Sequence, residues 1–267
     1  MKRERNTRST RGTRVSCSFL CFLCFLCSVP AFGQSVSVAL KRFEVIRVDS
    51  SDIQRVPNDL RQIFADPVPD AEVVNSLADA TMRVGFTARL PKSEKMPRFA
   101  VVAPVGEQMK INVGELRQAL TDAKAGDVMV PDSWDGVTID LHQPPGVFAD
   151  FGTFFMVQAP LLTFSVRPGF QLDQFAEVLC RILGMDAAQS STIRQTFAVT
   201  PMAFFPIPRR YDMDVHQVKL KAGSGTLFQN GSKQGELALA WSDADRTYFL
   251  SGQLTEAEAN AAADSIQ

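Results

Sequence analysis

The chain has 267 residues, with 28 basic, 29 acidic and five cysteine residues. The first 33 residues hold six of the basic residues, one acid and four of the cysteines, so the remainder carries 22 basic and 28 acidic residues and a net charge of about −6. This charge argues against nucleic acid or an anionic lipid surface as partner. One cysteine, Cys180, excludes an internal disulfide, but a chain of this length can bury a sufficient core without one.

Residues 1–33 are predicted to be a signal peptide. An apolar run from Val15 to Cys27 follows a basic leader and is too short to span a bilayer comfortably, and Ala31-Phe32-Gly33 offers small residues to a signal peptidase. The basic residues are Lys2, Arg3, Arg5, Arg8, Arg11 and Arg14. We expect cleavage before Gln34 and export to the periplasm or beyond, with an uncleaved N-terminal anchor as the alternative.

An N-terminal arm is expected over residues 34–69. Ser35 to Val48 alternates like an extended segment, and Leu60 to Ala65 is compatible with a short helix. The break at Asp66 to Asp70, which contains two prolines, is where we place the boundary with a single α+β domain over residues 70–267.

The first half of this domain is expected to alternate between helices and strands. A helix capped by Asp70 should run to about Arg83 and stop at Gly85, and Asn112 should cap a second helix that ends near Lys124. Four segments are predicted to be extended: Phe86–Leu90, Phe99–Pro104, Lys110–Asn112 and Gly136–His142.

Further along, Phe148 to Gln158 is apolar on both faces, which predicts a central strand covered on both sides. Gln171 to Leu183 is expected to be helical, and Asp186 with Gln189 should cap a following helix. The apolar residues at helical spacing are Leu172, Phe175, Ala176, Leu179 and Ile182.

The C-terminal stretch predicts a β-meander closed by a helix. Thr255 with Glu258 forms a capping box for a helix from Glu256 to Ile266, and Trp241 is expected to point into the core near this helix. The expected strands and turns are Val215–Ala222, a break at Gly223–Gly225, Thr226–Gln229, a turn at Asn230-Gly231, Leu237–Trp241 and Tyr248–Gly252. The predicted fold class is α+β, with a mainly antiparallel sheet and helices packed on it.

Residues with catalytic or metal-binding chemistry are sparse. His142 and His216 each end a predicted strand, without metal-ligand spacing, and are interpreted as structural. Cys180 lies between apolar helical residues and is expected to be a buried, inert thiol. Ser224 between two glycines is predicted to be a turn residue. We therefore predict no catalytic, metal or cofactor-binding residue, and no cofactor.

Two features leave alternatives open. The pairs Asp212 with Asp214 and Asp243 with Asp245 could hold a calcium ion in a loop, although solvated turn carboxylates are the better interpretation. A group of phenylalanines fits either a plain core or an apolar cavity that admits a lipid-like ligand. These are Phe148, Phe151, Phe154, Phe155 and Phe164.

Several short segments carry a family resemblance. They are Gly85–Pro91, Gly225–Leu227, Leu237–Trp241, Tyr248–Gly252 and the terminal helix at Ala261–Ile266. Together they resemble an uncharacterised extracytoplasmic domain of bacterial anti-sigma-factor-like regulators, which has been compared with lipoprotein-sorting carriers. The resemblance covers residues 70–267, and its motifs are structural, so it implies no catalytic residue.

Family members that act as anti-sigma factors carry a cytoplasmic zinc-binding segment and a membrane helix. We recognise neither in this sequence, so the resemblance implies the sensing or binding half. The expected function is a non-catalytic exported domain that binds a protein or cell-envelope component, and the resemblance implies a role in signalling related to anti-sigma regulation. A periplasmic carrier of a hydrophobic ligand is the alternative, and a hydrolase is third. A cavity between sheet and helices would favour the carrier, whereas a contiguous exposed apolar patch would favour the partner binder.

Overall fold

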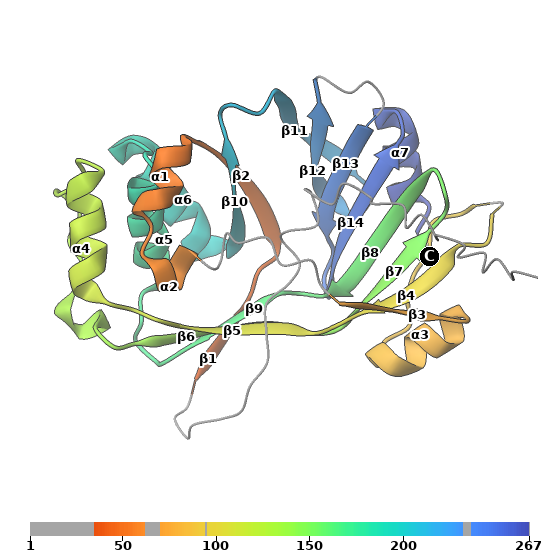
Figure 1. Ribbon diagram of the computed structural model, residues 1–267, viewed down its shortest axis with the longest axis horizontal. Helices are drawn as coiled ribbons and strands as arrows, with labels where there is room; N and C mark the ends of the chain where they lie inside the picture. Colours follow the sequence, from red (N-terminus) through yellow and green to blue (C-terminus); the bar gives the residue numbers. More distant parts are fainter. Residues whose placement is uncertain (1–34, 62–69, 94, 232–235, 267) are drawn as a thin grey trace, which may run out of the picture.

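The computed structural model describes residues 35–61, 70–93, 95–231 and 236–266 (Figure 1). Within these ranges the α+β fold is confirmed, with seven α-helices and 14 strands in sheets of eight, four and two strands. The predicted signal peptide and the break at residues 66–69 lie outside the described residues. None of the described helices is both long and apolar enough to cross a membrane.

The large sheet is antiparallel throughout. In spatial order its strands are β11 (Met213–Leu220), β12 (Gly223–Asn230), β13 (Glu236–Ser242), β14 (Arg246–Gln253), β8 (Phe154–Pro160), β7 (Gly146–Asp150), β4 (Arg98–Val102) and β3 (Ala71–Val74). The predicted C-terminal meander is therefore confirmed as β11 to β14, and β14 joins it to the rest of the sheet through β8.

Both faces of the central strands of this sheet, β13, β14 and β8, are buried, whereas the edge strands β11 and β3 are partly exposed. Helices α3 (Leu77–Val84) and α7 (Glu256–Asp264) contribute to the core on one face, where Trp241 is 3% exposed and belongs to the same cluster as Ala259 of α7. On the other face Phe228 contacts Phe205 with ring centroids 5.9 Å apart. The predicted burial of Trp241 beside the closing helix is thus confirmed.

Three chain segments pass from the large sheet into the four-stranded sheet without changing their order. The small sheet has the order β1 (Val36–Ala39), β9 (Thr163–Val166), β6 (Thr138–Gln143) and β5 (Val105–Lys110). Prolines lie where each of these three segments crosses from one sheet to the other. They are Pro104 between β4 and β5, Pro144 and Pro145 between β6 and β7, and Pro160 at the end of β8. Because proline cannot donate a hydrogen bond to a ladder, prolines at these positions favour a break in the pairing with one neighbouring strand, where the sheet can bend, although Pro160 still pairs with Arg246 of β14.

Helices cover the small sheet on the left of Figure 1. They are α1 (Ser50–Arg55), α2 (Asn58–Arg61), α4 (Val113–Asp122), α5 (Leu172–Ile182) and α6 (Ala187–Val199), with a 3-10 turn at Asp132–Trp134. The side chains of Asn112 and Asp186 accept the N–H groups of Glu115 and Gln189, so both predicted caps are confirmed. Gly184, at φ 86°, ends the α5 segment where a Cβ would lie 2.9 Å from the Asp52 carboxylate.

The segment expected as an arm takes part in two sheets. Strand β1 pairs with β9, and β2 (Arg42–Val48) pairs in parallel with β10 (Met202–Pro208). Val48, Val56 and Leu60 are fully or almost fully buried in the core beneath the helices.

Two predictions in residues 70–90 were wrong. The helix expected from Asp70 begins only at Leu77, because Ser76 provides the cap by accepting the Asp79 N–H at 3.1 Å, and the preceding residues pair as β3. Phe86–Leu90 forms no strand. Its backbone is held by the buried amide of Gln158, which accepts from the Arg89 N–H at 2.9 Å and donates to the Arg89 carbonyl at 2.7 Å.

Two further turns lie elsewhere than predicted. Residues Phe148–Gln158 form a hairpin of β7 and β8, which turns at Gly152 with φ 89°, instead of one strand. Gly223–Gly225 belongs to β12, and the chain turns just before it. At Gly225 a Cβ would come within 2.9 Å of the ends of the Leu220 and Leu239 side chains, so a larger residue would require these leucines to shift.

Candidate functional site: an apolar cavity

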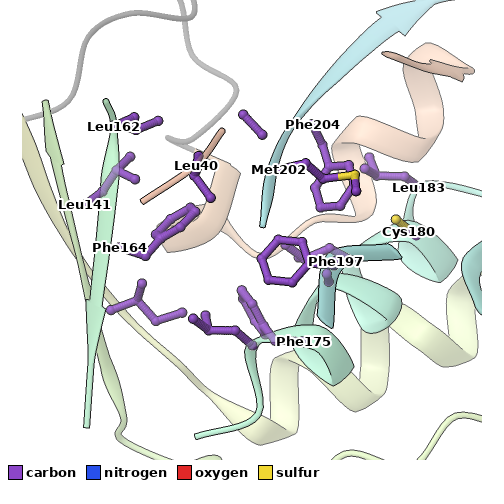
Figure 2. A pocket seen from close by; sticks show the side chains of 15 residues that line it. Leu40, Leu141, Leu162, Phe164, Phe175, Cys180, Leu183, Phe197, Met202 and Phe204 are labelled. Atoms are coloured by element: carbon purple, nitrogen blue, oxygen red, sulfur yellow. The ribbon is translucent and has the colours of Figure 1, made fainter. Parts of the chain in front are cut away.

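An apolar cavity of about 60 Å³ lies between the small sheet, helices α5 and α6, and strand β10 (Figure 2). All of its lining residues are apolar apart from the thiol of Cys180. They are Leu40, Ile139, Leu141, Leu162, Phe164, Leu172, Phe175, Ala176, Leu179, Cys180, Leu183, Phe197, Met202, Ala203 and Phe204.

Sheet pairing and helical spacing place these side chains. Leu141 of β6 and Phe164 of β9 are direct register partners, so they project from the same face of the sheet. Opposite them, Leu172, Phe175 and the residues one turn further on form the inward stripe of α5. Leu40 joins from the short segment between β1 and β2, where its N–H donates to the Leu162 carbonyl at 2.8 Å.

We assign the mouth of the partly open cavity to its four half-buried lining residues, because the other lining residues are buried. The four are Leu162, Phe164, Leu172 and Phe204. All four also pack against two core clusters, the one beneath the helices and the one between the large sheet and the β2–β10 pair. The cavity therefore lies where these two cores meet and reaches the surface at their junction.

Aromatic rings pack against one another in the wall and behind it. Phe197 of α6 stacks on Phe204 of β10, with centroids 6.1 Å apart and planes 20° apart. Phe175 packs edge-on against Trp134 at 6.0 Å, behind the wall. A lining of this composition offers no strong hydrogen bond, so it favours a dry interior and selects for apolar groups by shape.

Cys180 is a buried wall residue with a neutral thiol. Burial, with smaller contributions from the charges of Glu177 and Glu44, raises its pKa to about 12. The predicted burial of Cys180 is confirmed, and because the thiolate is the nucleophilic form, the raised pKa is consistent with the inert thiol expected from the sequence.

The five phenylalanines proposed to surround a cavity are divided among three places. Phe164 lines the cavity. Phe148 and Phe155 stack on one face of the β7–β8 hairpin at 5.3 Å, and Phe151 stacks on Phe154 at 4.6 Å on the other. The remaining aromatic wall residues, Phe175, Phe197 and Phe204, were not assigned to a cavity from the sequence, because they come from separate elements with no shared local pattern.

The other candidate residues are not brought together. His216 contacts Asp214 at 3.2 Å and Glu256 at 3.3 Å on the surface, while His142 is exposed on β6. Ser224 is an exposed residue of β12, not a turn residue. No group of three or more potential metal ligands is found in the described part of the chain.

The Asp243 and Asp245 pair belongs to a polar network that the sequence did not predict. One Asp243 oxygen accepts from Arg89 at 2.6 Å and from the Tyr248 hydroxyl at 2.8 Å, and the other accepts two backbone N–H groups. Burial opposes ionisation of Asp243, but these hydrogen bonds outweigh it and lower its pKa. Burial and Asp243 together raise the pKa of Tyr248 to about 12. The network ties the loop at Arg89 to the meander.

Fold and site together define an α+β protein with a small apolar cavity at the junction of its cores. No family model matches the chain, and neither a curated protein nor a solved structure matches it.

Proposed function

We propose that this protein is an exported, non-catalytic binder of a hydrophobic ligand, whose apolar part enters the cavity between the small sheet and α5. The observation that carries this proposal is a lining of 15 residues, all apolar except for the buried thiol of Cys180, with a half-buried rim. A cavity in this position is the feature that favours a carrier over a partner-binding domain.

The size of the cavity limits the ligand. A dry cavity of roughly 150 Å³ can hold benzene, and about 60 Å³ is smaller, so only a few carbon atoms fit without movement. A ligand with a longer hydrocarbon chain can enter only if the rim side chains of Phe164 and Phe204 rotate outward. Met202 lines the cavity behind the rim, and its unbranched side chain adapts readily to a new shape.

Binding of a protein or envelope component has weaker support. The exposed large apolar side chains of the described residues lie on different strands, helices and loops, whereas a docking surface is usually contiguous. They are Val36, Val73, Met82, Met96, Met129, Val199 and Tyr211. Signalling related to anti-sigma regulation therefore stays a prediction from the resemblance.

Calorimetric titration with straight-chain carboxylates of increasing length tests the proposal. Ala203→Val adds two methyl groups inside the cavity on a β-strand, where valine is favoured, and Ala71→Val makes the same change at an exposed strand position. We expect saturable 1:1 binding that weakens at least tenfold in Ala203→Val and is unchanged in Ala71→Val. Equal binding by both variants, or none by the unaltered protein, would contradict it.

A further inference from the structure

Three arginines meet in an open hollow at the ends of β2 and β10. The hollow has a volume of about 470 Å³ and is lined by Arg47, Arg209, Arg210, Tyr211, Asp212 and Met213. Because β2 and β10 are parallel, their carboxyl ends lie together, and the Arg209 N–H extends the pairing by donating to the Val48 carbonyl at 2.8 Å. The pairing therefore brings Arg47 close to two arginines more than 160 positions away in the sequence.

The guanidinium groups are positioned by largely neutral contacts. Arg47 donates to the backbone carbonyls of Tyr211, at 3.3 Å, and Met213. Arg210 lies over the Tyr211 ring, 5.2 Å from its centroid. Among the described residues, neither Arg47 nor Arg210 forms an ion pair, and Arg209 has only Asp49 at 3.9 Å.

Asp212 also lines the hollow and offsets one of its three positive charges. Its carboxylate lies against the backbone of Gly231, where a Cβ would come within 2.5 Å of it. No ion pair joins Asp212 to the three arginines in the described part of the chain. The hollow thus keeps a net positive charge, although residues 34–267 carry a net negative charge.

We propose that this hollow is a binding site for a phosphate group. Guanidinium groups bind oxyanions through paired N–H donors, and several of them around one hollow match the three or four oxygens of phosphate better than the two of a carboxylate. The group could be free phosphate or the headgroup of a phospholipid, and the site is independent of the apolar cavity.

Calorimetry at low salt with inorganic phosphate and with dihexanoyl phosphatidic acid below its micellar concentration tests this site. Arg210→Gln and Arg209→Gln should each weaken binding at least fivefold. Arg98→Gln removes the same charge from an 84% exposed side chain on β4 and should have no effect. Phosphate binding should persist in Ala203→Val. A failure of the phosphate-site proposal can therefore be distinguished from a failure of the proposal that the apolar cavity binds a ligand.

A comparison of the two affinities shows whether the site takes free phosphate or the headgroup of a phospholipid. Similar affinities support a site for free phosphate, and much tighter binding of the lipid that is still lost in Arg210→Gln supports a headgroup site. Absence of saturable binding by both ligands, or an equal loss in Arg98→Gln, would overturn the proposal.

Discussion

Glu107 of β5 lies directly opposite Leu141 of β6, so its carboxyl group shares a sheet face with the wall of the cavity. One carboxyl oxygen of Glu107 is buried without a hydrogen-bond partner among the described residues. Burial raises the pKa of this group, because the charged form loses part of its hydration and this oxygen gains no hydrogen bond in return.

Glu107→Gln should therefore stabilise the protein at neutral pH. The folded state holds the Glu107 proton to higher pH than the unfolded state, so this group makes the protein less stable as pH rises from about 4.3 through the folded pKa. Glutamine does not titrate, so the variant lacks this contribution to the pH dependence of the free energy of unfolding. Urea unfolding between pH 4.5 and 7.5 should show an advantage for the variant that grows with pH, and a constant difference would contradict the assignment.

Trp241→Ala should cost about 3 to 5 kcal/mol of unfolding free energy, because it leaves a large void beside α7. Lys219→Ala, on the exposed side of β11, should change the same quantity by less than about 0.5 kcal/mol. Urea denaturation measures both. Near-native stability of Trp241→Ala would show that the tryptophan does not anchor the core.

Asp243→Ala should lower the free energy of unfolding, measured by urea denaturation, by about 2 to 4 kcal/mol. The substitution leaves Arg89, Tyr248 and two backbone N–H groups without their acceptor. Asp245→Ala, at a 55% exposed side chain, should cost less than about 1 kcal/mol. Since the folded pKa of Asp243 is lowered, its contribution is present above about pH 4 and is lost as pH falls through the folded pKa. Equal losses in the two variants would refute the network's role.

Cys180 should neither make the stability of the folded protein depend on reductant nor react with thiol reagents in the folded state. With one cysteine in residues 34–267 and a pKa of about 12, the monomer should melt at the same temperature with and without dithiothreitol. Its thiol should react with Ellman's reagent only after urea is added. Rapid reaction of the native protein would show that the cavity wall opens frequently.

Helix caps and strand alternation, which depend on residues close together in the sequence, could be predicted. The caps at Asn112, Asp186 and Thr255 are set by residues three positions apart, and the alternation in β13 places Trp241 correctly. The β7–β8 hairpin was missed because both strands are apolar on both faces, which masks the turn at Gly152.

The cavity could not be located from the sequence because it depends on long-range pairing. Leu40, Phe164 and Phe204 meet only after β1 pairs with β9 and β2 pairs with β10. The stripe on α5 was predicted, but a stripe that faces a cavity has the same spacing as one that faces a filled core. The arginine hollow likewise arises from the parallel β2–β10 pair.

Fluorescence of Trp134 tests ligand entry into the cavity most directly. Trp134 is 2% exposed and touches the wall residue Phe175, while the other tryptophan, Trp241, lies in the core on the far face of the large sheet. In Trp241→Phe protein, a brominated decanoic acid should quench Trp134 saturably, and unlabelled decanoic acid should reverse it. Adding Ala203→Val should raise at least tenfold the concentration of brominated acid needed for quenching, and adding Ala71→Val should leave it unchanged. Quenching that is absent, or that persists undiminished with Ala203→Val, would contradict a ligand site in this cavity.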